Sequence, residues 1–453
     1  MVACPCSIGH RLRVLKNTNG AIFATIYALF LLDNTLLTVV VPIIPDYLFS
    51  LTAAVANDSS LSELASLSPL QRRYDDELES SSGPLGTLLA SKAFVQLLFT
   101  PLLGYVTSTV SYNVPLLVGS CNLFVAALLF AYGNSFGVLI LARALHGSSS
   151  AAIAVSGMSI LAATVPPDSR ARVMPVAFGG IALGVLIGYP LGGACYQLLG
   201  KTAPFLFIAF FVAITIAMQL VLLDEELQRS RLKSEASLAE CLILLRDKRT
   251  LILGSSICVS TSSMSVLESC VPIWLLTHFD PTPTRWQLGA IFIPDSVGYF
   301  LGSHFAGLLK VTAWRLATAA MVVAGLSCCF LPLATSLHQL TLPHFGLGLG
   351  VGVLDASLVP LLANLVERKG SAQYGPIYAF QQTSVAVAYA FGPLLAGQGV
   401  RLVGFPWVIR TVGFMNLVLC PLLAELEHEQ DEMQSLSRDD HAASYSSLET
   451  IEE

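Results

Sequence analysis

Long apolar segments recur along the chain, separated by short polar stretches. A helix needs about 20 mainly apolar residues to cross a bilayer, because it rises 1.5 Å per residue through a hydrocarbon layer about 30 Å thick. Twelve segments are this long, six before a charged stretch and six after it: 21–45, 84–107, 114–132, 136–165, 173–199, 203–223, 250–276, 286–309, 315–335, 343–366, 374–398 and 404–424. The pattern predicts an all-α membrane protein with 12 transmembrane helices in two six-helix bundles.

The apolar and polar segments divide the chain into consecutive parts. We expect a cytosolic N-terminal segment (1–20), an N-terminal bundle (21–223) with a lumenal loop at about 49–83, a cytosolic linker (224–249), a C-terminal bundle (250–424) and an acidic cytosolic tail (425–453). The first span is not a cleaved signal peptide, because it is too long and polar residues interrupt it.

Composition supports a membrane protein and argues against an enzyme. The 453 residues are 54% hydrophobic and only 12% charged, whereas soluble proteins carry about 25% charged residues. The net charge of -6 lies in the tail, which has ten acidic residues and one basic residue. No basic patch interleaved with aromatics suggests nucleic acid, and no nucleophile, nucleotide or metal-binding motif appears. We expect no cofactor and no metal site.

The distribution of basic residues predicts the orientation. An even number of spans places both termini on one side, and that side carries 15 Lys and Arg residues against 5 on the other. Positive residues accumulate on the cytosolic side of membrane proteins, so both termini are expected in the cytosol. The loop at 49–83 then faces a lumen, where the sequon at Asn57 is a candidate glycosylation site.

Ionisable residues interrupt several of the predicted spans. A charge at the bilayer centre costs on the order of 3 kcal/mol or more, so each one needs a partner, water or a function. Asp33 and Asp355 lie deep in spans of opposite halves, and we favour a functional role for them and for Glu268. The alternative for each is a structural ion pair, which we favour for Lys92 and Arg143. The remaining ionisable residues in the spans are His146, Asp295, His304 and Arg410.

Glycines recur in the fifth span from Gly179 to Gly193, with Pro190 among them, and Gly392–Gly397 in the eleventh span repeats part of the pattern. Small residues four positions apart allow helices to approach closely. Helix packing explains the pattern, and the matching positions in the two halves favour an internal repeat.

Several of these stretches together resemble the vesicular amine transporters of the major facilitator superfamily, and the monoamine branch more than the acetylcholine branch. The similarity extends from about residue 20 to residue 424. The matching stretches are Leu31–Tyr47, Ala90–Leu98, Leu141–Gly147, Gly200–Leu206, Leu267–Trp274, Arg285–Gly289, Val353–Ser357, Tyr374–Ala379 and Gly404–Trp407. The resemblance implies the major facilitator fold, with the substrate between the two bundles near the bilayer midplane.

The resemblance also assigns roles to individual residues. It implies that the substrate amine contacts Asp33, Asn34, Glu268, Tyr299, Tyr389 and Ser149, the last within the cluster Ser148–Ser150. It implies proton coupling by Asp355, together with Glu268, and a charge network around Arg143 and Lys92. The glycine-rich stretch resembles the antiporter motif, here Gly180, Gly184, Gly188, Pro190, Gly192 and Gly193.

The chain departs from the family at several places. Gln382 occupies the position of an aspartate that pairs with the lysine of the second span, so Lys92 lacks that partner. Asp295, where a small neutral residue is expected, is a candidate replacement. Gly370 occupies the position of a histidine before the eleventh span. The predicted lumenal loops contain no cysteine.

Together these features predict a proton-coupled antiporter that loads cationic monoamines into acidic secretory or synaptic vesicles, with the amine, protons and membrane lipid as its partners. The tail segment Tyr445–Leu448 has the Tyr-x-x-bulky pattern of a trafficking signal, although a solvated, disordered tail is the alternative. Two other functions stay open, an exporter of other organic cations such as drugs or polyamines and an amine-binding relative that does not transport.

Overall fold

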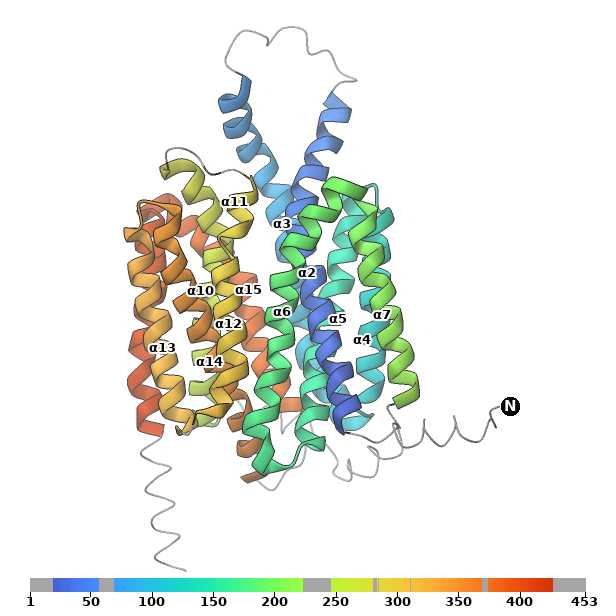
Figure 1. Cartoon of the computed structure of the whole chain (residues 1–453), viewed down its shortest axis with the longest axis vertical. Helices are drawn as coiled ribbons and strands as arrows, with labels where there is room; N and C mark the ends of the chain where they lie inside the picture. Colours follow the sequence, from blue (N-terminus) through green and yellow to red (C-terminus); the bar gives the residue numbers. More distant parts are fainter. Residues whose placement is uncertain are drawn as a thin grey trace, which may run out of the picture.

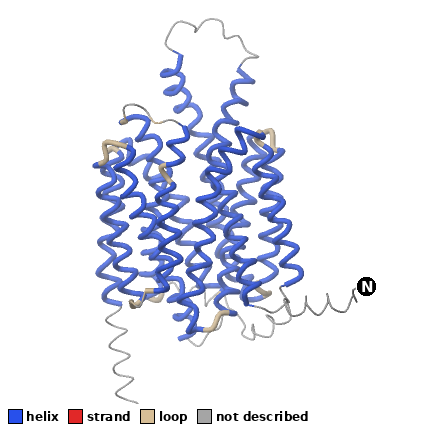
Figure 2. The backbone as a smooth tube through the Cα atoms, in the orientation of Figure 1, coloured by secondary structure: helices blue, strands red, loops and turns tan. Residues whose placement is uncertain are grey.

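The computed structural model describes residues 19–56, 69–222, 246–279, 283, 285–309, 311–368 and 374–426. These residues form helices joined by short turns, and the described part of the chain contains no strand (Figure 2). The helices are α2 (Asn19–Ala56), α3 (Pro69–Thr109), α4 (Asn113–Tyr132), α5 (Phe136–Thr164), α6 (Pro167–Leu199), α7 (Thr202–Leu222), α10 (Lys248–His278), α11 (Arg285–Ala290), α12 (Ile293–Phe305), η1 (Ala306–Leu308), α13 (Ala313–Phe330), η2 (Leu331–Leu333), α14 (Leu337–Arg368), α15 (Gly375–Val403) and a last helix, Phe405–Leu426.

The predicted all-α fold is confirmed. Ten helices in the described residues are long and apolar enough to cross a membrane. The two other predicted spans, 84–107 and 286–309, lie in α3 and in the stretch from α11 to η1. This stretch is broken at Ile291 and Phe292, and Pro294, whose ring nitrogen cannot donate a helical hydrogen bond, is the second residue of the helix that follows.

The polar loop predicted at 49–83 is largely helical. Helix α2 continues to Ala56 and α3 begins at Pro69, so both helices extend beyond the apolar spans and project from the bundle (Figure 1). Apolar content defines only the part of a helix that lies in lipid. Helical propensity carries α2 further, because Ala and Leu favour helices and predominate at 51–56.

Helices α2 to α7 form one half of the molecule, and α10 to the last helix form the other half (Figure 1). We call the end of the bundle where α2 begins and the last helix ends the terminal face. Helices α3, α5 and α6 of the N-terminal half contact α12, α14 and α15 of the C-terminal half. Residues on these helices therefore meet at the interface between the halves.

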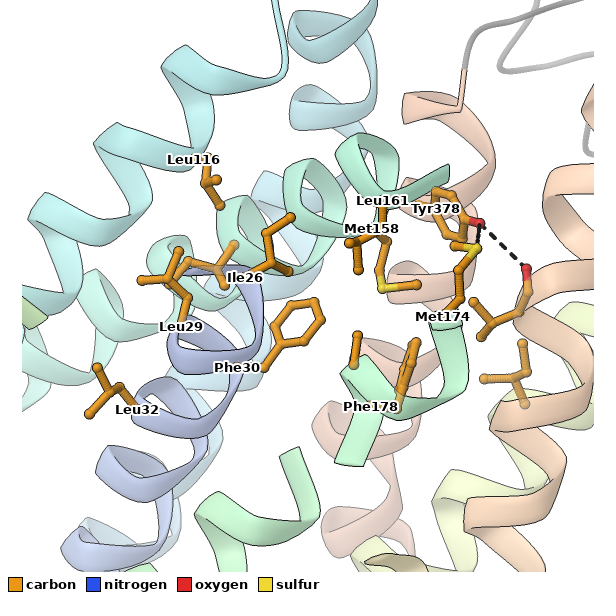
Figure 3. Close-up of a cluster of buried hydrophobic side chains, with 14 of the residues drawn as sticks. Ile26, Leu29, Phe30, Leu32, Leu116, Met158, Leu161, Met174, Phe178 and Tyr378 are labelled. Carbon is orange, nitrogen blue, oxygen red and sulfur yellow. Dashed lines mark hydrogen bonds between the residues drawn. The ribbon is translucent and has the colours of Figure 1, made fainter. Parts of the chain in front are cut away.

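Buried apolar side chains pack inside the halves and across their interface. Phe30 of α2 lies against Phe178 of α6, with ring centroids 6.2 Å apart (Figure 3). The Tyr378 hydroxyl, from α15, donates to the Val359 carbonyl at 3.4 Å and contacts the Met174 sulfur at 3.8 Å. On the outside, Leu198 and Leu402 are at least 80% exposed, as expected for side chains that face lipid.

Glycines of the predicted antiporter motif bring α6 against α2. A Cβ added at Gly184 would collide with the Leu31 carbonyl, and one added at Gly180 would lie 2.8 Å from the Tyr27 carbonyl. Thr35 donates to the Gly184 carbonyl at 3.3 Å across the same contact. No atom lies within 4 Å of a Cβ added at Gly193. The first glycines of the motif therefore set the α2–α6 distance, and Gly193 does not.

Replacing Gly184 by valine should destabilise the protein, because the side chain has no space between α6 and the Leu31 carbonyl. Overpacking of this kind costs about 1–3 kcal/mol. Thermal unfolding of the detergent-purified protein, followed by intrinsic fluorescence, should show a lower Tm for Gly184→Val than for the matched control Gly193→Val. Equal Tm values for the two variants would contradict close packing at Gly184.

Candidate functional site

Asp33 lies near the middle of the part of α2 that spans the membrane, and its side chain faces α5. The Ser150 hydroxyl donates to the two carboxylate oxygens of Asp33 at 2.8 and 2.9 Å. The Nε2 atom of His146 lies 3.3 Å from Oδ1 of Asp33. His146 and Ser150 are four residues apart, so they share one face of α5. These contacts hold a carboxylate that is only 7% exposed.

Two serines of the predicted cluster have different surroundings. Ser150 meets the Asp33 carboxylate, whereas the buried hydroxyl of Ser149, which is predicted to contact the substrate, has no hydrogen-bond partner among the described residues. Asn34 is partly exposed and donates to the Phe30 carbonyl at 2.9 Å. The four-residue spacing of His146 and Ser150 is the sequence signal that indicates a shared face, but the rotation of α5 decides which serine faces α2.

Lys92, on α3, donates to the Gln96 side chain at 3.5 Å, and its charge acts on carboxylates of both halves. It interacts electrostatically with Asp33 of the N-terminal half and Glu268 of the C-terminal half. Arg143 is near enough to oppose the Lys92 charge, and it is 1% exposed, with Nε and Nη1 unpaired among the described residues. The buried Arg143 and the half-buried Lys92 repel each other, and a buried charge needs an opposite charge. Glu268 reduces that cost from the opposite half.

In the C-terminal half, tyrosine hydroxyls accompany the carboxyl groups. Tyr299 of α12 donates to Asp355 of α14 at 2.7 Å. Tyr389 of α15 lies 3.5 Å from the Oε1 atom of Glu268 on α10. The structure thus brings both predicted tyrosines to the predicted carboxylates. A hydroxyl partner is neutral, so these carboxyl groups can bind and release a positive charge without breaking an ion pair.

Gln382 and Asp295 each have other partners in the structure. Gln382 is buried on α15 and donates to the Gln381 side chain at 3.4 Å. Asp295 lies in the first turn of α12 and interacts electrostatically with Glu268. Tyr189 of α6 interacts with both of these acids from the N-terminal half. Asp295 thus lies among the groups around Glu268, and its replacement of the missing aspartate stays a prediction.

A polar cluster that the sequence did not predict joins the halves at the terminal face. Arg170 of α6 donates to the Glu367 carboxylate of α14 at 2.7 Å and to the Tyr374 hydroxyl at 3.0 Å. The Tyr374 ring lies 5.3 Å from the guanidinium carbon, a cation–π distance. Tyr374 precedes α15, and burial together with Glu367 raises its pKa. Burial likewise raises the pKa of Tyr112, before α4, to about 12.

Small residues close the same face around this cluster. A Cβ added at Gly104 of α3 would lie 2.6 Å from Cβ of Ala379 on α15. Gly375 lies against Thr107, and Gly307 of η1 lies against the Ala171 carbonyl at the start of α6. Backbones of the two halves thus touch at the terminal face. The carboxylates lie deeper in the bundle than these contacts, which separate them from that face.

Three predicted features lie outside the described residues: the sequon at Asn57, the residue Gly370 and the tail segment Tyr445–Leu448. Within the described ranges, no cluster of three or more His, Cys, Asp or Glu residues is placed to hold a metal ion.

Comparison with known proteins identifies the class to which this fold and site belong. The Major Facilitator Superfamily model matches residues 23–373. The synaptic vesicular amine transporter of Mus musculus is 33% identical over 91% of this chain and 89% of its own length. The chromaffin granule amine transporter of Rattus norvegicus is 32% identical over 93% of this chain and 91% of its own length. Among solved structures, the human organic anion transporter MFSD10 superposes with a TM-score of 0.69 at 18% identity, covering 90% of this chain and 100% of that one.

The chain belongs to the major facilitator superfamily and, within it, to the vesicular amine transporters. It is a multi-pass membrane protein and a transporter, and it is not an enzyme. The likeness to MFSD10 concerns the fold alone, because the sequence identity is low.

Glu367→Gln should loosen the terminal face, because it removes the anion that binds Arg170 across the interface. We expect a cysteine at the buried position Thr107, introduced without other reactive cysteines, to react faster with a soluble maleimide in this variant. The matched control is Glu425→Gln, which removes an exposed ion pair with Lys248. Equal labelling rates in both backgrounds would contradict closure by the Arg170–Glu367 pair.

Proposed function

We propose that this protein is a proton-coupled antiporter that loads cationic monoamines from the cytosol into acidic vesicles. The observation that supports it most is the position of Asp33, a buried carboxylate that accepts from Ser150, lies beside His146 and is attracted by the charge of Lys92. The names of the relatives support an amine as the substrate. In this proposal the terminal face is cytosolic and both termini lie in the cytosol.

The amine would bind where its ammonium reaches Asp33. Attraction between opposite charges is far stronger in a low-dielectric interior than in water. Ser150 and His146 orient the carboxylate, and Asn34, one residue further on α2, offers a polar contact that is partly exposed. An arriving ammonium competes with Lys92 for Asp33, and Lys92 then retains Glu268 as its partner. Substrate binding in one half is thereby linked to a carboxylate of the other half.

Protons would drive the cycle through the C-terminal half. Protonation of Asp355 or Glu268 removes a negative charge that the substrate or Lys92 otherwise neutralises, and the tyrosine hydroxyls continue to hold the carboxyl groups. Each pH unit supplies about 1.4 kcal/mol per proton, and each charge that crosses 100 mV supplies about 2.3 kcal/mol. The contacts at the terminal face describe a conformation closed to the cytosol, from which release occurs into the lumen.

Asp33→Asn should abolish amine uptake while the protein still reaches vesicles, because the amide keeps the shape but carries no charge for the ammonium. Loss of an ion pair worth about 3 kcal/mol weakens binding roughly 100-fold. Uptake of a panel of labelled monoamines, polyamines and bulky cations into vesicles is the measurement, with the exposed Asp168→Asn as the control. Near-normal uptake by Asp33→Asn would refute the binding role of Asp33. If the unmodified protein takes up polyamines or bulky cations in preference to monoamines, those cations are its substrates.

Asp355→Asn should retain amine binding but lose accumulation driven by a pH difference, because the amide cannot exchange a proton. Tyr299→Phe removes only the hydroxyl that donates to Asp355, so it should slow this uptake without abolishing it. Equilibrium binding and proton-driven uptake, measured on the same membranes, separate the two effects. Accumulation by Asp355→Asn equal to that of the unmodified protein would exclude Asp355 as the proton carrier.

A further inference from the structure

Helices α12 and α14 pack through glycines at very short distances. A Cβ added at Gly302 of α12 would lie 2.7 Å from the Leu349 carbonyl, and one added at Gly348 of α14 would lie 2.6 Å from the Oδ1 atom of Asp295. Gly298 and Gly352 approach the partner backbone equally closely. This contact places polar side chains of α12 and α14 in a fixed arrangement.

Two buried polar groups at this contact have no hydrogen-bond partner among the described residues. The first is Oδ1 of Asp295, whose residue is 3% exposed. The second is the imidazole of His344, with both ring nitrogens unpaired and 0% exposure. A buried carboxylate without a partner is an unpaired ion and costs several kcal/mol. Asp295 therefore needs a proton or a nearby cation.

The two groups lie on neighbouring turns of the helix pair. The His344 ring packs against the ring of Phe292 at 5.9 Å, and Phe292 caps the helix whose first turn contains Asp295. On α14, Gly348 follows His344 by one turn and touches Asp295. The break in the eighth span at Ile291 and Phe292 is beside this pair, and discontinuous transmembrane helices commonly line ion and substrate sites.

We propose that Asp295 and His344 form a second proton-binding site, separate from the Tyr299–Asp355 pair. The inference rests on the proposed proton coupling and adds one exchangeable proton to it. In the closed arrangement described here the proton is on Asp295. When the two halves tilt and the side chains of Asp295 and His344 reorient, the O–H bond of Asp295 breaks and an N–H bond forms on His344, which leaves a carboxylate and an imidazolium, and His344 passes the proton on.

The surroundings suit a site that holds one proton. Glu268 of α10 interacts electrostatically with Asp295, so two neighbouring carboxyl groups share the region and disfavour two negative charges together. Tyr189 of α6 and Tyr389 of α15 also interact with Asp295. On α12 and α14 the other titratable groups facing this region are Tyr299 and Asp355, which bind each other. His344 lies seven residues into α14, about 10 Å from the end opposite the terminal face.

The number of protons exchanged for each amine tests the proposal. Purified transporter is placed in liposomes, the membrane voltage is clamped, and the equilibrium accumulation of a labelled monoamine is measured against the imposed pH difference. The logarithm of the accumulation ratio rises with a slope equal to the proton count. We expect Asp295→Asn and His344→Gln to lower this slope by about one. The control His304→Gln, whose ring bonds to the Phe300 carbonyl at the other end of α12, keeps the slope. An unchanged slope in Asp295→Asn overturns the proposal.

Infrared pH-difference spectra of the same proteins test the site without transport. They can therefore be measured even on a variant that fails to accumulate amine. The unmodified protein should show a carboxylic-acid band that is missing in Asp295→Asn and shifted in His344→Gln. Identical bands in all three proteins overturn the proposal. Absence of pH-driven uptake by the unmodified protein, by contrast, refutes the proposed antiport itself and leaves the infrared result to decide on the Asp295–His344 site.

Discussion

The structure depends on partners that offset the cost of burying carboxylates inside a membrane. Asp33 receives two hydrogen bonds from Ser150, one contact from His146 and the field of Lys92. Glu268 and Asp355 are accompanied by tyrosine hydroxyls instead. A single ammonium group is thus shared between the halves, and its position responds to the charge on either side. The glycine contacts bring the helices close enough for these short interactions to form.

Much of the fold could be predicted, because the length and spacing of apolar segments reflect the thickness of the membrane. The break between α11 and α12 lies within an apolar run, where hydropathy carries no signal, and the extensions of α2 and α3 depend on helical propensity in polar segments. Carboxylates deep in apolar spans, such as Asp33 and Asp355, were found because their burial is costly and therefore conspicuous.

The fine geometry of the site could not be predicted, because it depends on how each helix is rotated. One residue separates Ser149 from Ser150, which is about 100° around α5, and only packing against α2 decides which hydroxyl reaches Asp33. The Arg170 cluster escaped prediction for a different reason. Its members lie at span ends about 200 residues apart in sequence, where charged residues are ordinarily solvated, and only the approach of the two halves brings them together.

The glycine contacts have a mechanical consequence. Helices α2 and α6 touch backbone to backbone, and so do α12 and α14, so neither pair can slide without steric collision. Each helix pair then moves as one rigid body that carries its polar groups with it. The site can open to the other side of the membrane only when one pair tilts relative to the other. Such a tilt changes the distances from Lys92 to Asp33 and to Glu268.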